Sequence, residues 1–355
     1  MVKVAGHSAG ERGGRRRGTG PTVADVARRA GVSPMTVSRV ANGESNVLPD
    51  TRRKVERAID ELGYVPNLAA RSLAGGRPPR IALLHSNPSA AYLSEFLVGC
   101  LAEASKRGVQ LVVEFYDEAE RASDFARRIV SRRIDGVLLP PPLCDDDALM
   151  ARLREAGLAL VQVATGRPDG RSHAVTIDDE AAAFTMTRRL LESGHRAIGF
   201  ITGNPNQTAS GLRLAGYRRA LAEFGVAARD DLVAGGDFTY RSGWEAAEQL
   251  LRAVPRPTAI FASNDDMAAA AISVAHRAGI DVPRELSVCG FDDTALATTI
   301  WPELTTIRQP IAEMARKAIG LLAEAVAGEG KPGAQHQRLA FTLIERGSDA
   351  GLESG

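Results

Sequence analysis

Hydroxyl and guanidinium side chains are concentrated in one short stretch near the start of the chain. Within seven residues the sequence holds Ser33, Thr36, Ser38 and Arg39. Hydroxyls can donate hydrogen bonds to phosphate oxygens, and a guanidinium can donate two parallel hydrogen bonds to the edge of a guanine. This set of side chains therefore indicates DNA recognition by hydrogen bonding rather than a covalent reaction.

A second set of polar and aromatic side chains lies in the body of the chain, mostly just after short apolar runs. Amide, carboxylate and guanidinium groups bind the hydroxyls of a sugar-like ligand, and an aromatic ring covers its C–H face. The candidates are Ser86, Asn87, Tyr92, Arg213, Phe238, Asn264, Asp265 and Trp301. Structural alternatives stay open for four of them: Tyr92 at a dimer interface, Arg213 in a surface ion pair, Phe238 in the core and Asp265 as a helix cap.

Motifs of common enzyme sites are missing from the sequence. It contains no G-x-x-x-x-G-K-[ST] phosphate loop, no G-x-G-x-x-G after the first strand and no H-E-x-x-H. Cys100, Cys144 and Cys289 have no metal-ligand spacing, and their odd number argues against a disulfide framework. The sequence therefore predicts that the protein is not an enzyme and uses no metal and no cofactor.

Three predicted helices near the N-terminus hold the first set of side chains. Thr22 and Asp25 form a capping-box pattern at the start of the first helix. Ser33 can cap a second helix over 34–41, and a third covers 50–62. Two short helices joined by a Gly-containing turn and braced by a third form a helix-turn-helix, although any small three-helix domain gives a similar pattern.

A further short helix is predicted just after this head, from Asn67 to Ala74. Two turns of helix are only marginally stable in water, so the segment should fold only against a partner, such as its twin in a dimer on DNA. Leu73 is the apolar side chain that we expect to insert into the minor groove. An ordinary linker helix is the structural alternative.

The rest of the chain alternates short apolar strands with amphipathic helices. This alternation predicts an α/β fold of parallel sheets covered by helices on both faces. A pattern that continues over some 260 residues suits two lobes better than one. The predicted organisation is a disordered basic arm at 1–20, a helix-turn-helix domain at 21–65, a hinge helix and linker at 66–79, an effector-binding and dimerisation core at 80–346, and a tail at 347–355.

Charge is unevenly distributed along a chain whose formal net charge is +1. Residues 1–79 hold 14 basic and 7 acidic side chains, whereas the remainder holds 30 basic and 36 acidic ones. A basic head on an acidic body indicates that the head alone binds nucleic acid. No apolar run reaches the ~18 residues of a membrane span, and residues 1–20 hold no hydrophobic segment. We therefore expect a cytoplasmic protein that is associated with the nucleoid when bound to DNA.

Three motifs in the first 73 residues are more specific than the helix pattern. The pattern V-x-D-V-A-x-x-A-G-V-S-x-x-T-V-S-R-V begins at Val23, an x-G-Y-x-P-N closure ends at Asn67, and an A-x-x-L hinge ends at Leu73. With these motifs the chain resembles, over almost its whole length, the lactose-repressor/galactose-repressor (LacI/GalR) family of bacterial transcription regulators. The resemblance implies a helix-turn-helix head, a hinge helix, and a core like that of periplasmic sugar-binding proteins, with two lobes of doubly wound parallel sheets.

The resemblance also implies roles for individual residues. Arg39 and Met35 are expected at base edges, and Pro34 and Met35 occupy the two positions that vary most with operator sequence. Contacts with phosphates and sugars are implied for Thr22, Ser33, Thr36, Ser38, Asn42 and Asn46, and DNA contacts of the hinge for Asn67, Ala70 and Leu73. Effector contacts are implied for Tyr92, Leu93, Arg213, Phe238 and Asp265.

Two lobes joined by three crossovers are a further implication of the resemblance. The crossovers are expected near 164–176, 292–306 and 338–342, which places the N-terminal lobe at about 80–165 and 307–340 and the C-terminal lobe at about 166–306. Gly211 and Ala164 stand where family members often carry an arginine and an aspartate. Both departures remove polar groups that hold a small hexose, which favours a larger glycoside, a sugar acid or a non-sugar effector.

The predicted function is that of a sequence-specific DNA-binding regulator, a repressor of carbohydrate-utilisation genes. Two heads of a homodimer would read the half-sites of an operator, while a sugar, glycoside or sugar acid between the lobes changes the spacing of the hinge helices. The alternatives are a purine or nucleoside effector, a protein coregulator, or no effector. The tail at 347–355 lacks a leucine heptad, so we expect a dimer without a C-terminal coiled coil.

Overall fold

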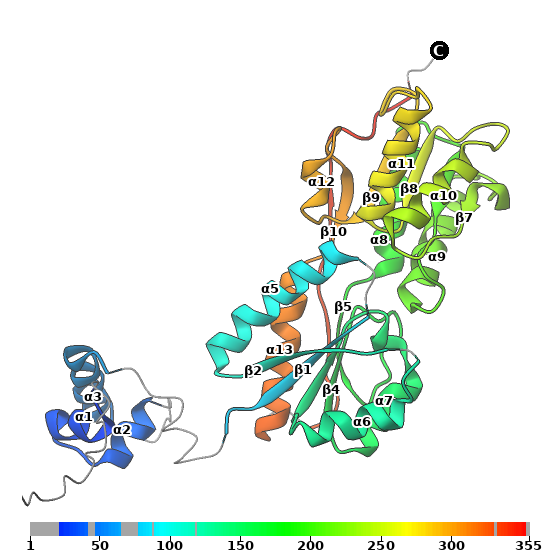
Figure 1. Ribbon diagram of the computed structural model, residues 1–355. Helices are drawn as coiled ribbons and strands as arrows, with labels where there is room; N and C mark the ends of the chain where they lie inside the picture. The colour runs from blue at the N-terminus through cyan, green and yellow to red at the C-terminus, as the bar shows by residue number, and fades with distance from the viewer. Residues whose placement is uncertain are drawn as a thin grey trace, which may run out of the picture. The chain divides into compact units, whose positions relative to one another are not determined.

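The fold is described from a computed structural model of the chain (Figure 1). The described residues are 21–41, 47–64, 77–86, 89–117, 119–329 and 332–352. The chain divides into two compact units, Met1–Pro78 and Pro79–Gly355. Among the described residues, no helix combines the length and the apolar character that crossing a membrane requires.

Within its described residues, the first unit contains helices α1 (Val23–Ala30), α2 (Pro34–Ala41) and α3 (Pro49–Leu62). Thr22 Oγ1 accepts the Asp25 N–H at 3.3 Å and the Asp25 carboxylate accepts the Thr22 N–H at 2.9 Å, so the predicted capping box is present. The core of this head consists of Val26, Ala27, Val37, Val40, Val55, Ala58 and Tyr64. The prediction of a three-helix head is confirmed.

The N-terminal lobe of the second unit is built on a sheet with the strand order β11-β5-β4-β3-β1-β2, in which all pairs are parallel. Its strands are β1 (Arg80–His85), β2 (Gln110–Phe115), β3 (Gly136–Leu139), β4 (Ala159–Val163), β5 (His173–Thr176) and β11 (His336–Arg338). One face is covered by α5 (Ala90–Arg107) and α13 (Ile311–Ala327), the other by α6 (Ala122–Ser131) and α7 (Asp147–Glu155). A short 3-10 helix, η1 (Leu143–Asp145), follows β3.

The C-terminal lobe repeats this plan with the strand order β12-β10-β9-β8-β6-β7, in which only the β10–β12 pair is antiparallel. Its strands are β6 (Ile198–Ile201), β7 (Val233–Ala234), β8 (Ala259–Ala262), β9 (Ser287–Asp292), β10 (Thr305–Arg308) and β12 (Thr342–Ile344). Helices α8 (Asp179–Glu192) and α9 (Thr208–Glu223) cover one face, and α10 (Tyr240–Leu250) and α11 (Asp265–Arg277) the other. Two short helices, η2 (Asp230–Leu232) and α12 (Leu296–Thr299), complete the lobe.

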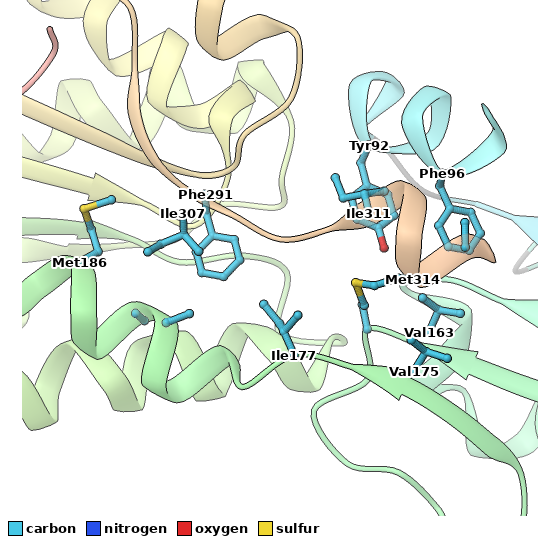
Figure 2. Packing of buried hydrophobic residues seen from close by; sticks show 14 of the residues in the cluster. Tyr92, Phe96, Val163, Val175, Ile177, Met186, Phe291, Ile307, Ile311 and Met314 are labelled. Atoms are coloured by element: carbon cyan, nitrogen blue, oxygen red, sulfur yellow. The ribbon is translucent and has the colours of Figure 1, made fainter. Parts of the chain in front are cut away.

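One hydrophobic cluster runs without a break from one lobe into the other (Figure 2). Tyr92, Val163 and Met314 belong to its part in the N-terminal lobe, and Met186 and Phe291 to its part in the C-terminal lobe. Because apolar surface gains free energy when it leaves water, this shared core favours lobes that remain in contact. The predicted fold class, a helix-turn-helix head followed along the chain by two doubly wound lobes, is confirmed.

Two of the predicted lobe boundaries need correction. We expected the first crossover at 164–176, but β5 pairs in parallel with β4 and therefore belongs to the N-terminal lobe. We expected the second crossover at 292–306, but β10 pairs with β9 and belongs to the C-terminal lobe. Both strands are only four residues long, and their lobe is decided by pairing with a distant strand rather than by their own sequence.

The predicted tail is also part of the folded C-terminal lobe as far as Leu352. Ser348 is completely buried, and its hydroxyl donates to the Val288 carbonyl at 2.5 Å. Asp349 accepts a hydrogen bond from Arg189 Nε at 3.0 Å. The tail was predicted as a segment outside the core, but these two side chains bond to β9 and α8 of the C-terminal lobe.

Candidate functional site

Helix α2 presents the predicted DNA-reading side chains on the surface of the head. Val37 and Val40 are buried in the head core, whereas Met35, Ser38 and Arg39 are exposed. An exposed helical face with a guanidinium and a hydroxyl is the geometry that enters a major groove.

Other predicted DNA contacts lie around the same helix. Ser33 caps α2, since its Oγ accepts the Thr36 N–H at 3.1 Å, and the two hydroxyls lie 2.9 Å apart. Pro34 is exposed at the first position of the helix, and Thr22 is exposed at the cap of α1. Five of the predicted DNA contacts lie outside the described residues: Asn42, Asn46, Asn67, Ala70 and Leu73.

A small cavity lies between the two lobes, at the carboxyl ends of the parallel strands. It is lined from the N-terminal lobe by Ser89, Tyr92, Pro141 and Ala164, and from the C-terminal lobe by Gln207, Ala209, Arg213, Phe238, Asn264, Asp292 and Gln309. The cleft outside the carboxyl ends of strands is where open α/β sheets bind ligands. The free volume is only about 30 Å³, so a ligand of hexose size requires the lobes to move apart.

Arg213 is the central charged group of this cavity. It is 4% exposed, and its Nε donates to Asp179 Oδ1 at 2.9 Å while Nη1 donates to the Ser263 carbonyl at 2.5 Å. Its guanidinium also lies over the Phe291 ring, 3.6 Å from the ring centroid. A buried charge is tolerated when it is paired and hydrogen-bonded in this way, and here the pairing neutralises the cation within the protein.

Several buried polar atoms around the cavity find no hydrogen-bond partner among the described residues. The Tyr92 hydroxyl and Gln309 Oε1 belong to residues that line the cavity, and Asp179 Oδ2 belongs to the ion-pair partner of Arg213. Buried polar groups are nearly always hydrogen-bonded, and leaving one unpaired costs about 1–3 kcal/mol. Unsatisfied atoms clustered at a cleft are therefore the expected signature of groups that bind a ligand.

Asp292 faces the cavity from the last position of β9. It is 5% exposed, and its Oδ1 accepts a hydrogen bond from Gln309 Nε2 at 2.6 Å. Burial raises the pKa of this carboxyl to about 7, although the charge of Arg213 acts in the opposite direction. A carboxyl with this pKa changes its protonation state close to neutral pH.

Backbone strain is concentrated at the same place. Ala164, Phe238 and Asp292 have φ angles of 56°, 72° and 110°, in the region that favours glycine. The Phe238 ring lies so close to Gly203 that a Cβ at Gly203 would be 2.0 Å from Phe238 Cζ, and Asn264 Nδ2 donates to the Phe238 carbonyl at 2.9 Å. Such conformations cost of order 1–3 kcal/mol each and cluster at functional sites.

The structure brings together four of the predicted effector contacts, Tyr92, Arg213, Phe238 and Asn264, around this cavity. Ser86 and Leu93 do not line the cavity, and Leu93 is half-buried on α5. Asn87 lies outside the described residues. Trp301 is 83% exposed and does not line the cavity. Of the two departures from the family pattern, Ala164 lines the cavity, and Gly211 has open space where a side chain would begin.

Asp265 is the predicted contact that most needs correction. Its Oδ2 accepts the Thr294 N–H at 2.7 Å and its Oδ1 accepts from the Thr306 hydroxyl at 2.7 Å, so the carboxyl ties α11 to the loop after β9 and to the start of β10. The preceding residue, Asn264, faces the cavity instead. Because Asp265 is the first residue of α11, its side chain turns back into the lobe, and its pKa is raised well above the usual value by burial.

Sequence reasoning missed several residues that line the cavity, most notably Asp292, Gln309, Gln207 and Ser89. The signal for Asp292 was available, since Asp292 and Asp293 follow the apolar run 286–291 just as Asn264 and Asp265 follow 259–262. Gln309 follows β10, a strand that was not predicted, so its position could not be inferred.

Comparison with protein families matches the two units separately. The family described as bacterial regulatory proteins, lacI family, matches residues 22–67. A periplasmic binding protein-like domain matches residues 187–348.

Comparison with individual proteins extends over nearly the whole chain. Catabolite control protein A of Priestia megaterium is 35% identical over 303 residues, which is 85% of this chain and 91% of the relative. A structure described as the transcriptional regulator CelR–cellobiose complex is 35% identical, covers 92% of this chain and 99% of its own, and has a TM-score of 0.71. A lac repressor dimer bound to operator and the anti-inducer ONPF is 27% identical, covers 94% of this chain and 100% of its own, and has a TM-score of 0.68.

Proposed function

Because the chain belongs to the lacI family of bacterial regulatory proteins, we propose that it is a repressor of carbohydrate-utilisation genes whose operator binding is controlled by a small ligand between its lobes. The proposal joins two separate parts of the chain. The head supplies the DNA-reading helix α2, and the second unit supplies the ligand cavity around Arg213. Neither part by itself accounts for regulation, which requires that the ligand changes the affinity for DNA.

Operator recognition is supported by the exposed face of α2 and by the operator complex of the related lac repressor dimer. We infer that this chain also acts as a homodimer, in the compartment that holds the chromosome, with Arg39 and Met35 at base edges. The hinge residue Leu73 is proposed to insert into the minor groove and bend the DNA.

The recognition contact has a direct test on DNA that the protein selects from a random pool. Arg39→Ala should weaken specific binding by about fivefold to a hundredfold and relax the preference at one base pair. Arg28→Ala is the matched control, because Arg28 is an exposed arginine on α1 rather than on α2. Equal effects of the two substitutions would contradict the assignment.

The observation that carries the effector proposal is a group of unsatisfied polar atoms at a cavity where Arg213, the one cation among the described lining residues, is already paired. Arg213 has its charge neutralised by Asp179, while Asp292 and Asp179 add carboxylate oxygens. An anionic ligand would meet these carboxylates without a cation to bind it, whereas hydroxyl groups can donate to them. The cavity therefore favours an uncharged sugar or glycoside over a sugar acid, with the Phe238 ring against its C–H face.

A thermal-shift screen of the full-length protein tests this function. We expect a saturable rise in melting temperature with an uncharged sugar or glycoside such as cellobiose or ribose, because a ligand that binds the folded state stabilises it. The same ligand should change operator affinity in a fluorescence anisotropy assay. A shift produced only by sugar acids would overturn the charge argument, and a shift only by purines or nucleosides would favour that alternative effector. A screen without any shift would favour a protein coregulator or a regulator without an effector.

A further inference from the structure

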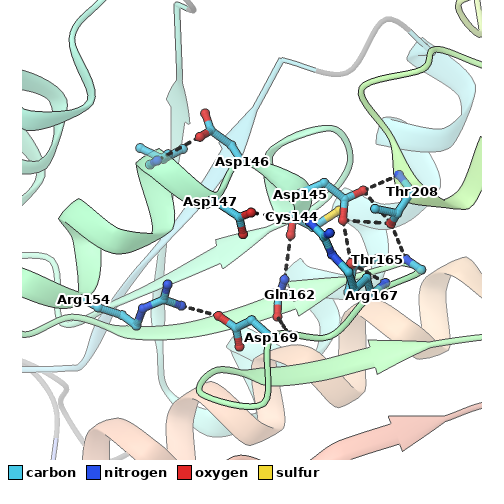
Figure 3. Close-up of polar contacts among 12 residues, drawn as sticks. Cys144, Asp145, Asp146, Asp147, Arg154, Gln162, Thr165, Arg167, Asp169 and Thr208 are labelled. Carbon is cyan, nitrogen blue, oxygen red and sulfur yellow. Dashed lines mark hydrogen bonds and ion pairs between the residues drawn. The ribbon is translucent and has the colours of Figure 1, made fainter.

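A carboxylate of one lobe caps a helix of the other lobe (Figure 3). Asp145 ends η1 in the N-terminal lobe, and Thr208 begins α9 in the C-terminal lobe. Asp145 Oδ2 accepts the Thr208 N–H at 2.8 Å, and the Thr208 hydroxyl lies 2.9 Å from both carboxylate oxygens. Asp145 Oδ1 also accepts a hydrogen bond from Thr165 Oγ1 at 2.6 Å, which holds the carboxylate in place from its own lobe.

Helix α9 depends on this contact for its N-terminal cap. Its own N-cap residue, Gln207, makes no capping hydrogen bond through its side chain. In contrast, α5, α7, α8, α10 and α11 are each capped by the side chain of the residue that precedes them. The first N–H groups of a helix have no partner within the helix, and a carboxylate there is favoured by the helix dipole. Asp145 supplies this partner only while the two lobes are together.

Close packing makes the contact specific to one arrangement of the lobes. The Gly166 N–H, in the loop after β4, donates to Thr208 Oγ1 at 2.7 Å. A Cβ at Gly166 would lie 2.7 Å from Leu212 Cδ1 and 3.0 Å from Thr208 Oγ1, so a larger residue would require the α9 side chains to shift. Five residues after Thr208, Arg213 reaches the ligand cavity from the next turn of the same helix.

We propose that Asp145 is a positioning residue that clasps α9 and holds the lobes closed over the effector. The proposal rests on the proposed function, because it assigns the regulation of the same cleft. Opening the lobes breaks charge-assisted hydrogen bonds and leaves the start of α9 uncapped. A ligand that bridges the lobes favours the same closed arrangement, so the clasp and the effector stabilise each other.

Distance measurements between the lobes test the clasp without any ligand. Spin labels are placed at Arg127→Cys on α6 and Arg252→Cys after α10, where both side chains are about four-fifths exposed. The native thiols of Cys100, Cys144 and Cys289 are buried, so the new cysteines are the ones that react. In the full-length protein, Asp145→Ala and Thr208→Val should each lengthen and broaden the distance distribution. Thr208→Val removes only the hydroxyl bonds and keeps the backbone N–H bond, so its effect should be the smaller one, and combining the two substitutions should add little to Asp145→Ala.

Asp146→Ala is the matched control for the loss of a helix cap. Asp146 is the neighbouring carboxylate, and it caps α7 within its own lobe by accepting the Leu149 N–H at 2.9 Å. This variant should lose stability while keeping the wild-type distance between the labels. A change in Asp146→Ala as large as that in Asp145→Ala, or unchanged distances in both, would overturn the clasp.

A second measurement separates the clasp from the effector proposal. With cellobiose as the probe, Asp145→Ala should raise the Kd by about tenfold to a hundredfold, and Asp145→Asn, which keeps one acceptor oxygen, should raise it less. If no sugar in the screen bound to the wild-type protein, the proposed function would be contradicted. The distances between the spin labels would still test whether Asp145 holds the lobes together. An unchanged Kd together with unchanged distances would reject the clasp and leave the proposed function standing.

Discussion

At the residue scale, the cavity between the lobes holds buried carboxyls that compete for one guanidinium. Arg213 is committed to Asp179, while Asp292 shares only a hydrogen bond with Gln309. The protein therefore accommodates Asp292 by raising its pKa rather than by giving it a full counter-charge. This arrangement links the stability of the second unit to pH.

The free energy of unfolding of Asp292→Asn should fall less than that of the wild type as pH rises. The ordinary pKa of the carboxyl is 3.8 and the folded value is about 7. Between these values the unfolded chain releases the proton while the folded chain keeps it, so stability falls as pH rises towards 7. The contribution is on the order of 4 kcal/mol at most. Urea unfolding at about pH 4.5 and about pH 8 should show that the stability of the variant relative to wild type is higher at the higher pH. A difference that does not change with pH would rule out this role of Asp292.

Tyr92→Phe should separate stability from ligand binding. The Tyr92 hydroxyl is buried without a partner among the described residues, so removing it should leave the free energy of unfolding unchanged or raise it by about 1 kcal/mol. The same change should weaken effector binding, because the hydroxyl is then missing when the ligand arrives. Chemical unfolding and titration calorimetry on the same sample check both. Weaker folding combined with unchanged binding would identify the hydroxyl as a structural group.

In contrast to Tyr92→Phe, Asp265→Ala should lower stability without directly weakening effector binding. The substitution leaves the Thr306 hydroxyl and the Thr294 N–H without their acceptor, so we expect a loss of about 1–3 kcal/mol in the unfolding free energy of the second unit. Any effect on the effector should follow from this loss, since the side chain does not line the cavity. Titration at a temperature well below the melting point tests this, and a binding defect without destabilisation would return Asp265 to the site.

The sequence was sufficient to find the neighbourhood of the cavity but not the side chains that face it. The rule that polar residues follow apolar strands selected Asn264, which lines the cavity, but it also selected Asp265, whose carboxyl points into the lobe. Which residue of such a pair faces the cleft depends on the backbone at the end of the strand. At Asp292 this backbone has a φ of 110°, a conformation that side-chain type alone does not predict for aspartate.

At the element scale, caps set where helices begin, and they were the local feature that sequence predicted best. The capping box of α1 was predicted from Thr22 and Asp25, because both of its hydrogen bonds form within four residues of chain. In contrast, the cap of α9 comes from Asp145, 63 positions earlier in the chain, and no local pattern reveals it. Short strands such as β5 and β10 follow the same rule, because their lobe is set by a distant partner.

Thr22→Ala should loosen α1 without affecting the second unit. Loss of an N-cap hydroxyl costs about 1 kcal/mol, which corresponds to a roughly fivefold increase in the opening of the helix. Hydrogen exchange measured by mass spectrometry on the full-length protein should show faster exchange in peptides covering residues 23–30. Peptides covering α9 serve as the internal reference, and equal exchange of α1 in variant and wild type would show that the capping box does not stabilise the helix.

At the scale of the whole molecule, the lobes are joined both by covalent crossovers and by noncovalent contacts that opening must break. The shared hydrophobic cluster passes through the crossovers, and near the cavity Ser89 Oγ donates to Asp266 Oδ2 across the lobes at 2.6 Å. The cavity is too small for a sugar in this closed arrangement. A ligand must therefore enter an open form and be enclosed as the lobes return, which makes the angle between the lobes the variable that binding controls.

If the cavity and the head are coupled through this angle, the coupling must be reciprocal. An effector that changes operator affinity by a given factor requires the operator to change effector affinity by the same factor, because both describe one thermodynamic cycle. For a typical coupling of 1–3 kcal/mol the factor is about 5–150. Anisotropy titrations of operator with and without effector give one ratio, and calorimetric titrations of effector with and without operator give the other. Non-operator DNA, bound by the head through charge alone, should give a smaller ratio in both directions. Unequal ratios for the operator would mean that the ligand and the DNA do not act through the same two states, and the lobe angle could not then be the link between them.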